Sequence, residues 1–279
     1  MRIYLTKLLF AIWPFSFAHV RIMNTLNPPS VDEVRHTRKI RGFSQLISFD
    51  PNSYIGKYLY YRGVFEEPIA RKIASSLKTG MTFIDVGANI GQHTLIASGA
   101  IGPSGRIVSF EPQEKVRELL KENINNNNLN NITVLPYALG QHDGSANIYH
   151  MNKKNDGEAS LRPGSFKESV TKEKITIRTL SGLMSELNIT HIDVMKIDIE
   201  GAELDMLKGS EAFFNRCKPK KIFIECVEKH LERFDTSSLA LTSWLIDQGY
   251  TLYQLEQWRW KEIKASPDLN SDLLAVIQN

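Results

Sequence analysis

Cysteine is scarce in this chain of 279 residues, and the two that occur, Cys217 and Cys226, are too few for a disulfide framework. They form no C-x-x-C pair, and no set of histidines, cysteines and carboxylates has the sequence spacing of a metal site. The sequence therefore predicts no metal ion. It predicts two reduced cysteines in or near the core, as is typical of a cytoplasmic protein.

An excess of charge of one sign is also missing. The chain has 34 Lys and Arg residues and 31 Asp and Glu residues, for a net charge of +3. A nucleic-acid-binding surface needs clustered basic residues, so we expect no nucleic-acid partner. The hydrophobic fraction of 42% and the charged fraction of 23% are those of an ordinary globular protein.

Long apolar runs are absent too, since the most apolar stretch, residues 8–18, is shorter than the roughly 20 residues that span a membrane. This stretch follows Arg2 and Lys7 and contains Pro14, which would kink a helix. We treat residues 1–27 as an apolar N-terminal extension with three interpretations. They are an anchor lying in a membrane surface, a helix packed on the domain, and an uncleaved signal-like start. We expect a cytoplasmic protein, and peripheral membrane contact through this extension stays open.

The most informative stretch is residues 82–94, T-F-I-D-V-G-A-N-I-G-Q-H-T. Its first five residues predict a buried strand, the next five a tight glycine turn, and residues 93–100 a helix. Strand, glycine turn and helix N-terminus together place a nucleotide-like cofactor at the carboxyl edge of an open α/β sheet. A dinucleotide turn has glycine at its first, third and sixth positions. Asn89 and Gln92 occupy the third and sixth positions here, which counts against a dinucleotide.

Two acids narrow the choice of cofactor. Asp85 comes directly before the turn, where it would favour a cofactor with an ammonium or a sulfonium and disfavour a pyrophosphate. Glu111 ends a second predicted strand, residues 106–110, about twenty residues after the turn. An acid at that place can accept hydrogen bonds from both ribose hydroxyls. S-adenosylmethionine, an adenosine with two positive centres and no phosphate, fits these features.

Three motifs carry a resemblance to a known family: D-V-G-A-N-I-G-Q-H-T at 85–94, F-E-P at 110–112 and K-I-D-I-E-G at 196–201. Their order and spacing resemble those of the FkbM-type methyltransferases, over roughly residues 43–277. The chain departs from the family at His93, where a larger aromatic is more common, and at Ser181, where an aspartate is usual. Neither departure affects the glycine turn or the acids.

The resemblance implies an α/β fold of the class I (Rossmann-like) methyltransferase type, with a seven-stranded, mostly parallel sheet, an antiparallel last strand and helices on both faces. Beyond the two strands above, we expect strands at 132–135, 192–197, 221–227, 250–255 and 273–277. We divide the chain into the extension 1–27, a helical or lid segment 28–80, and a cofactor-binding methyltransferase domain 81–279. The residues expected to bind S-adenosylmethionine lie on the turn, on the helix after it or at neighbouring strand ends: Asp85, Gly87, Asn89, Gly91, His93, Thr94, Glu111 and Ala138.

The third motif supplies the candidate catalytic residues. Side chains alternate along a strand, so Lys196, Asp198 and, if the strand geometry continues, Glu200 point the same way. Asp198 or Glu200 would act as general base with a raised pKa, or Lys196 would do so if burial depressed its own pKa. A structural ion-pair network is the alternative. Glu225, on the next strand, would hold Lys196 or contact substrate, whereas His230 is expected at the surface.

Three segments are candidates for acceptor selection. The aromatic-rich residues 54–64 are expected to fold over the cleft. The polar loop 152–174 is interpreted either as a flap near the substrate mouth or as a surface insertion. Trp258 and Trp260 lie in a last hairpin and would stack on a sugar or, as we expect, pack against the protein.

The sequence as a whole predicts an enzyme, an S-adenosylmethionine-dependent O-methyltransferase. The family's range makes the partner a small-molecule or glycan acceptor, with methyl transfer to a hydroxyl of a sugar, a glycan or another natural product. Two alternatives are a nicotinamide-dependent oxidoreductase on the same kind of sheet and a non-catalytic glycan-binding protein. Asn89 and Gln92 count against the first, and the combination of glycine turn, Glu111, Asp198 and Glu200 counts against the second.

Overall fold

The structure is a computed structural model, and it describes residues 35–151, 159–160 and 170–277. The predicted N-terminal extension, residues 1–27, lies outside this range. Most of the polar loop predicted at 152–174 lies outside it as well.

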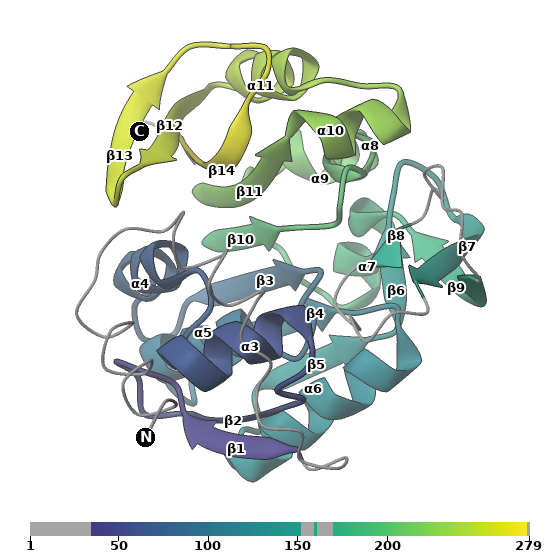
Figure 1. Cartoon of the computed structure of the whole chain (residues 1–279). Helices are drawn as coiled ribbons and strands as arrows, with labels where there is room; N and C mark the ends of the chain where they lie inside the picture. The colour runs from purple at the N-terminus through teal and green to yellow at the C-terminus, as the bar shows by residue number, and fades with distance from the viewer. Residues whose placement is uncertain (1–34, 152–158, 161–169, 278–279) are drawn as a thin grey trace.

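An eight-stranded sheet forms the centre of the protein, in the order β13-β12-β14-β11-β10-β3-β4-β5 (Figure 1). Its strands in chain order are β3 (Thr82–Val86), β4 (Arg106–Phe110), β5 (Ile132–Leu135), β10 (Val194–Ile197), β11 (Lys221–Val227), β12 (Tyr250–Glu256), β13 (Arg259–Ile263) and β14 (Asn270–Ile277). The five neighbouring strands β5, β4, β3, β10 and β11 pair in parallel, whereas β14 is antiparallel to both β11 and β12. The predicted α/β class with an antiparallel last strand is confirmed. The edge strand β13, paired with β12, adds an eighth strand to the seven expected.

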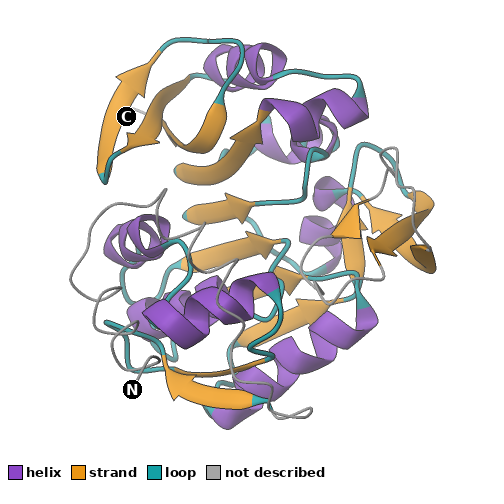
Figure 2. Ribbon diagram, in the orientation of Figure 1, coloured by secondary structure: helices purple, strands orange, loops and turns teal. Residues whose placement is uncertain are grey.

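Helices cover both faces of this sheet, as the purple helices around the orange strands of Figure 2 show. Phe83 of β3 packs in a cluster with residues of α4 (Glu67–Ser76) and α5 (Gln92–Ile101). Its neighbour Ile84 belongs to a second cluster with residues of five other helices: α7 (Leu180–Glu186), α8 (Glu203–Lys208), α9 (Glu211–Phe214), α10 (Glu228–Leu231) and α11 (Ser238–Asp247). Successive side chains of a strand point to opposite faces, so each face of β3 has its own apolar layer.

Two smaller sheets flank the central one. A hairpin of β1 (His36–Lys39) and β2 (Leu46–Phe49) precedes α3 (Tyr54–Arg62). The helix α6 (Glu114–Asn126) packs against β2 of this hairpin. The side chain of Asn123 on α6 accepts from the N–H of Ser48 and donates to its carbonyl. The other sheet has the order β6-β9-β7-β8, with β6 (Tyr137–Leu139), β7 (Gly144–Met151), β8 (Ala159–Ser160) and β9 (Val170–Arg178). Two parts of the polar loop predicted at 152–174 are described, and both are strands. Residues 159–160 form β8, and residues 170–174 belong to β9.

The two cysteines are unpaired, with Cys226 buried and Cys217 half-buried, as predicted. Trp258 and Trp260, the two tryptophans of the predicted last hairpin, differ. Trp260 packs edge-on against Phe223, with ring centroids 6.0 Å apart, which confirms packing for that residue. Packing is wrong for Trp258, which is 48% exposed at the hairpin turn, where its φ is +73°.

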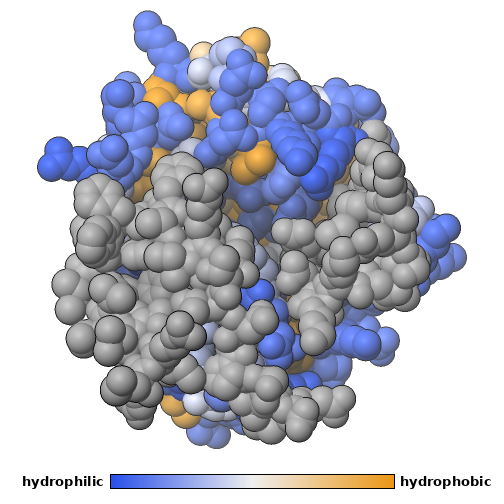
Figure 3. Space-filling view, in the orientation of Figure 1, coloured by the Kyte–Doolittle hydropathy of each residue, from blue (hydrophilic) through white to orange (hydrophobic). Residues whose placement is uncertain are grey.

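Within the described ranges, no helix combines the length and the apolar character needed to cross a membrane. The described part of the face in Figure 3 is mostly hydrophilic, with apolar patches near its upper end.

Candidate active site

A pocket of about 470 Å³ lies where β3, β4, β10 and β11 end. Its walls come from the glycine turn after β3, the segment after β4, the loop after β10, and the end of β11 with the helix that follows, together with residues of and after α3 and residues of β6 and β7. Ligands of open α/β sheets bind at this edge, because the loops at the carboxyl ends of parallel strands meet there. The position of the pocket follows from the topology of the sheet.

The glycine turn is tied to both neighbouring strands. The N–H groups of Gly87 and Ala88 both donate to the carbonyl of Phe110, at 3.0 and 2.9 Å. Gly87 has a φ of +77°, and a Cβ on it would overlap the carbonyl oxygen of Asp198. Only glycine meets both requirements, because other residues rarely adopt this φ and would need the space that Asp198 fills.

Glu111 forms the wall beside the turn. Its side chain is 3% exposed, and its two carboxyl oxygens accept from the N–H groups of Asn89 (3.0 Å) and Gln113 (2.9 Å). Burial raises the pKa of Glu111 to about 7, although these hydrogen bonds and Arg117 act against the shift. The group can therefore change its charge near neutral pH.

Asp85 and Thr94 lie behind the pocket and do not line it. Thr94 Oγ1 donates a hydrogen bond to Asp85 Oδ2 at 2.6 Å and shares a second hydrogen bond with the hydroxyl of Ser109 at 2.8 Å. Asp85 is fully buried and stands opposite Lys196 in the pairing of β3 with β10. Because both side chains are buried under the turn, the structure gives them a supporting position where we expected cofactor contact. Gly91, at the start of α5, is likewise outside the lining.

His93 does line the pocket, and one of its nitrogens is free among the described residues. The residue is 6% exposed, and its Nε2 makes no hydrogen bond there. The nearest carboxylate oxygen, Glu66 Oε2, is 4.0 Å away. Burial and the nearby Lys196 hold the pKa of His93 well below its usual range. The imidazole is therefore neutral, and its approach to Glu66 is not an ion pair.

Lys196 and Asp198 form a close ion pair, with Nζ 3.0 Å from Oδ2. Burial by itself would lower the pKa of Lys196, but the carboxylates of Asp198, Asp85 and Glu66 outweigh it and raise the pKa above its ordinary value. The predicted pairing of the two residues is confirmed. The alternative that Lys196 serves as a base through a depressed pKa is wrong, because three acids surround its ammonium group.

Glu200 leaves the strand and turns to other partners. Its φ of +58° breaks the extended geometry after β10, so it does not continue the alternation of Lys196 and Asp198 as expected. Its Oε2 lies 3.3 Å from His230 Nδ1, and Glu225 Oε2 lies 3.0 Å from the same nitrogen. The expectation that His230 is a surface residue is wrong, because it is half-buried and lines the pocket.

The three residues of this second group lie close enough to share one ion. Ligand atoms of Glu200, Glu225 and His230 all lie within 4.8 Å of one another. Burial and the nearby carboxylate of Glu225 raise the pKa of Glu200 to about 8. Burial and Asp198 raise that of Glu225 to about 9. The fold assembles this group from separate parts of the chain, so its spacing in the sequence gives no sign of it, and the expectation that no metal is bound stays a prediction.

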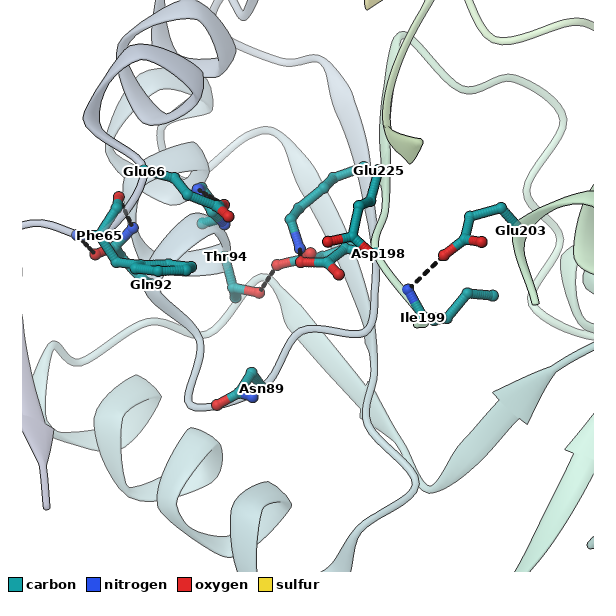
Figure 4. A network of polar contacts seen from close by, with 12 residues as sticks. Phe65, Glu66, Asn89, Gln92, Thr94, Asp198, Ile199, Glu203 and Glu225 are labelled. Atoms are coloured by element: carbon teal, nitrogen blue, oxygen red, sulfur yellow. Dashed lines mark hydrogen bonds and ion pairs between the residues drawn. The ribbon is translucent and has the colours of Figure 1, made fainter. Parts of the chain in front are cut away.

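The aromatic segment 54–64 contributes to the pocket wall, as expected, since Tyr54 and Ile55 line it, and Phe65 directly after the segment lines it too. Gln92 holds this segment in place: its side-chain amide donates to the carbonyl of Phe65 and accepts from its N–H, at 2.8 and 2.7 Å (Figure 4). Gln92, which stands where a dinucleotide turn has its last glycine, thus serves to hold the aromatic segment against the turn. Glu66, which sequence reasoning missed, also lines the pocket, and its only sequence signal was its place before the helix-starting Glu67-Pro68.

Figure 4 shows the network as a whole, with Asp198 and Glu225 side by side at its centre and Glu203 reaching the N–H of Ile199. The pocket suits a nucleoside cofactor without phosphates. An acid, Glu111, stands beside the turn, the glycine leaves the backbone open, and Ala138 adds a small side chain to the lining. The free nitrogen of His93 is available for a polar group of the cofactor.

A mainly parallel sheet, a glycine turn after β3, an acid after β4 and a pocket across the strand ends define the class I methyltransferase fold. The FkbM methyltransferase domain model matches residues 85–252, and the chain belongs to this family. The family's model is described as a methyltransferase domain, which makes S-adenosylmethionine the cofactor to expect in this pocket. The nicotinamide alternative is thereby set aside.

Two curated proteins illustrate the relationship. The hexuronic acid methyltransferase AglP of Haloferax volcanii is 30% identical over 152 residues, which cover 52% of this chain and 56% of AglP. Methyltransferase 1 of Beauveria bassiana is 25% identical over 142 residues, 45% of this chain and 57% of that protein. The chain therefore spans little more than half the length of these relatives. Among solved structures, the precorrin-6y C5,15-methyltransferase of Geobacter metallireducens aligns with 77% of this chain and 90% of that one, at 13% identity and a TM-score of 0.46.

Proposed function

We propose that this protein transfers the methyl group of S-adenosylmethionine to a hydroxyl oxygen of a sugar or a related small molecule. The Lys196–Asp198 pair carries the proposal. It puts a carboxylate in the same pocket as the glycine turn and the Glu200–Glu225–His230 group. Bound S-adenosylmethionine supplies an electrophilic methyl group.

Residues of the turn side would hold the cofactor. Glu111 would accept hydrogen bonds from the ribose hydroxyls, and Asn89 and Ala138 would contact the nucleoside. The neutral ring of His93 has a free nitrogen for a polar group. Asp85 and Thr94 would act indirectly, by supporting the turn and Lys196.

Asp198 is the proposed general base. In the transfer, a lone pair of the acceptor oxygen forms the bond to the methyl carbon, the bond from that carbon to sulfur breaks, and the hydroxyl proton passes to the carboxylate. Lys196 stays protonated and orients Asp198. Holding the oxygen and the methyl group in line is the larger part of such catalysis, because the reaction is a displacement between two bound partners.

Two basic side chains of the pocket favour an acceptor that carries an anionic group. Lys229 and Arg233 line the pocket beside His230, and they would face a carboxylate while a neighbouring hydroxyl reached Asp198. AglP, by its name, acts on a hexuronic acid, which carries both groups. Uronic acids are therefore the first acceptors to test.

The test is transfer of labelled methyl from S-adenosylmethionine to a panel of uronic acids, neutral sugars and their glycans. We expect label in an ether-linked methyl, stable to mild alkali, and at least a hundredfold slower transfer by Asp198→Asn with the cofactor still bound. Label released by mild alkali would mean methylation of the carboxyl group and would contradict hydroxyl transfer. An Asp198→Asn enzyme as fast as the wild type would remove Asp198 as the base.

A further inference from the structure

The group of Glu200, Glu225 and His230 is assembled from three separate elements. Glu200 comes from the loop after β10, Glu225 from the end of β11 and His230 from α10 (Glu228–Leu231). The imidazole Nδ1 lies 3.0 Å from Glu225 Oε2 and 3.3 Å from Glu200 Oε2. All three residues line the pocket, so a bound acceptor can reach them.

The backbone around the group is held in place before any ligand arrives. Glu203 is buried, and its Oε1 accepts from the N–H groups of Ile199 and Gly201, both at 3.1 Å. Gly201 has a φ of +112°, and a Cβ on it would overlap the carbonyl oxygen of His230. The loop that carries Glu200 is therefore packed directly on the backbone that carries His230.

The carboxylates of this group outnumber the basic groups that contact them, because Lys229 and Arg233 line the same pocket but form no ion pair with Glu200 or Glu225 among the described residues. Glu200 and Glu225 face one imidazole, and Asp272 stands opposite Glu225 in the pairing of β11 with β14. Lys196 is paired with Asp198. A single protonated histidine would neutralise only one of the two glutamates, and close buried carboxylates repel each other unless protons or a cation intervene.

We propose that Glu200, Glu225 and His230 bind one divalent cation at the acceptor end of the pocket. Two carboxylates and an imidazole suit a first-row ion such as Mn²⁺, which takes both oxygen and nitrogen ligands. Open coordination positions facing the pocket would take oxygens of the acceptor. The inference rests on the proposed function: a carboxylate such as Asp198 is a weak base toward an alcohol, and coordination to a cation makes a hydroxyl more acidic.

Calorimetric titration of the chelator-treated full-length protein with MnCl₂ tests the proposal. We expect one saturable site, with at least tenfold weaker binding in Glu225→Gln and in His230→Asn. The matched controls Glu118→Gln and His191→Asn change exposed side chains of the same kinds, 60% and 59% exposed, and should bind Mn²⁺ as the wild type does. No saturable binding, or binding that survives both pocket variants, would overturn the proposal and leave a protonated histidine bridging two glutamates.

Two further measurements separate the possible failures. Mn²⁺ should raise the melting temperature of the wild-type protein, since a ligand that binds only the folded state stabilises it, and this readout depends on no variant. S-adenosylmethionine is titrated into the chelator-treated protein in parallel. Cofactor binding without Mn²⁺ binding would refute the cation site while leaving the methyltransferase proposal intact. Mn²⁺ binding together with label transfer that chelation does not slow would refute the cation's role in holding the acceptor.

Discussion

Gly87 of the cofactor turn lies directly against the carbonyl of Asp198, the first residue after β10. The contact joins the part of the pocket that would hold the cofactor to the residue that would receive the proton. Asp198 in turn donates its backbone N–H to the carbonyl of Val86, at 3.1 Å, so the two strand ends are bonded as well as packed. The distance between the two halves of the site is thus set by backbone, which hardly moves when side chains change rotamer.

Replacing Gly87 by alanine should therefore affect both halves at once. The new Cβ would overlap the Asp198 carbonyl and would also require an unfavourable backbone conformation, which costs about 1–3 kcal/mol. We expect a free energy of unfolding lower by at least that amount in urea denaturation, and loss of measurable S-adenosylmethionine binding. Gly144→Ala is the matched control, because a Cβ there meets nothing within 4 Å. Normal cofactor affinity in Gly87→Ala would show that the turn does not contact the cofactor.

The affinity for S-adenosylmethionine should rise with pH through the titration of Glu111. Burial raises its pKa to about 7, so the carboxyl is mostly protonated at pH 6 and ionised at pH 8. The ionised form accepts hydrogen bonds from ribose hydroxyls more strongly, so we expect severalfold tighter binding at pH 8 by calorimetry. Glu111→Gln should bind more weakly at both pH values. The ligand's own titration affects both proteins alike, so an equal pH dependence in the variant would rule out Glu111 as its source.

Removing the ammonium of Lys196 should destabilise the fold as well as stop the reaction. Lys196 is buried among Asp198, Asp85 and Glu66, and breaking such a buried pair costs about 3–5 kcal/mol because an acid is left without its partner. We expect Lys196→Met to lower the free energy of unfolding at pH 8 by an amount in this range. The loss should shrink at lower pH, where the raised pKa of Asp85 lets that acid become neutral.

The matched control for this variant is Lys208→Met, at an exposed position on α8. It should leave the free energy of unfolding within about 0.5 kcal/mol of the wild type. A Lys196→Met protein as stable as this control would mean that the surrounding acids are already neutral in the wild type.

Glu203 should control the position of Glu200 without touching the acceptor. Its carboxylate holds the N–H groups of Ile199 and Gly201, and leaving buried donors unsatisfied costs about 1–3 kcal/mol. We expect Glu203→Ala to be destabilised by this amount and to lose methyl transfer. Glu203→Gln, which keeps an acceptor oxygen, should recover most of both. If the glutamine variant were as impaired as the alanine variant, the hydrogen bonds would not be the reason.

Local pattern was enough for the parts of the fold that depend on neighbouring residues. Apolar runs marked the central strands, and β11 was predicted with its observed bounds, Lys221–Val227. The turn was recognisable because its glycine sits directly after a buried strand, and Glu111 because it ends the next one. Such residues can be placed from sequence because each one's position follows from the strand to which it belongs.

The group of Glu200, Glu225 and His230 could not be predicted in this way. Glu200 was expected to follow Lys196 and Asp198, but its positive φ sends the side chain elsewhere. His230 lies in a charged stretch that looked like a surface, and its glutamate partners come from other elements. The nearest sequence signal was Gly201, whose lack of a side chain permits the contact with the His230 backbone.

The sequence by itself determined the class of fold, the cofactor turn and the family, because these depend on residues that are close along the chain and on the alternation of a strand. The tertiary structure alone decided the charges and contacts of the site. It surrounded Lys196 with three acids, so that the residue cannot be a base, and it brought two glutamates to one histidine. Both results depend on burial and on distances between strands, which no spacing along the chain expresses.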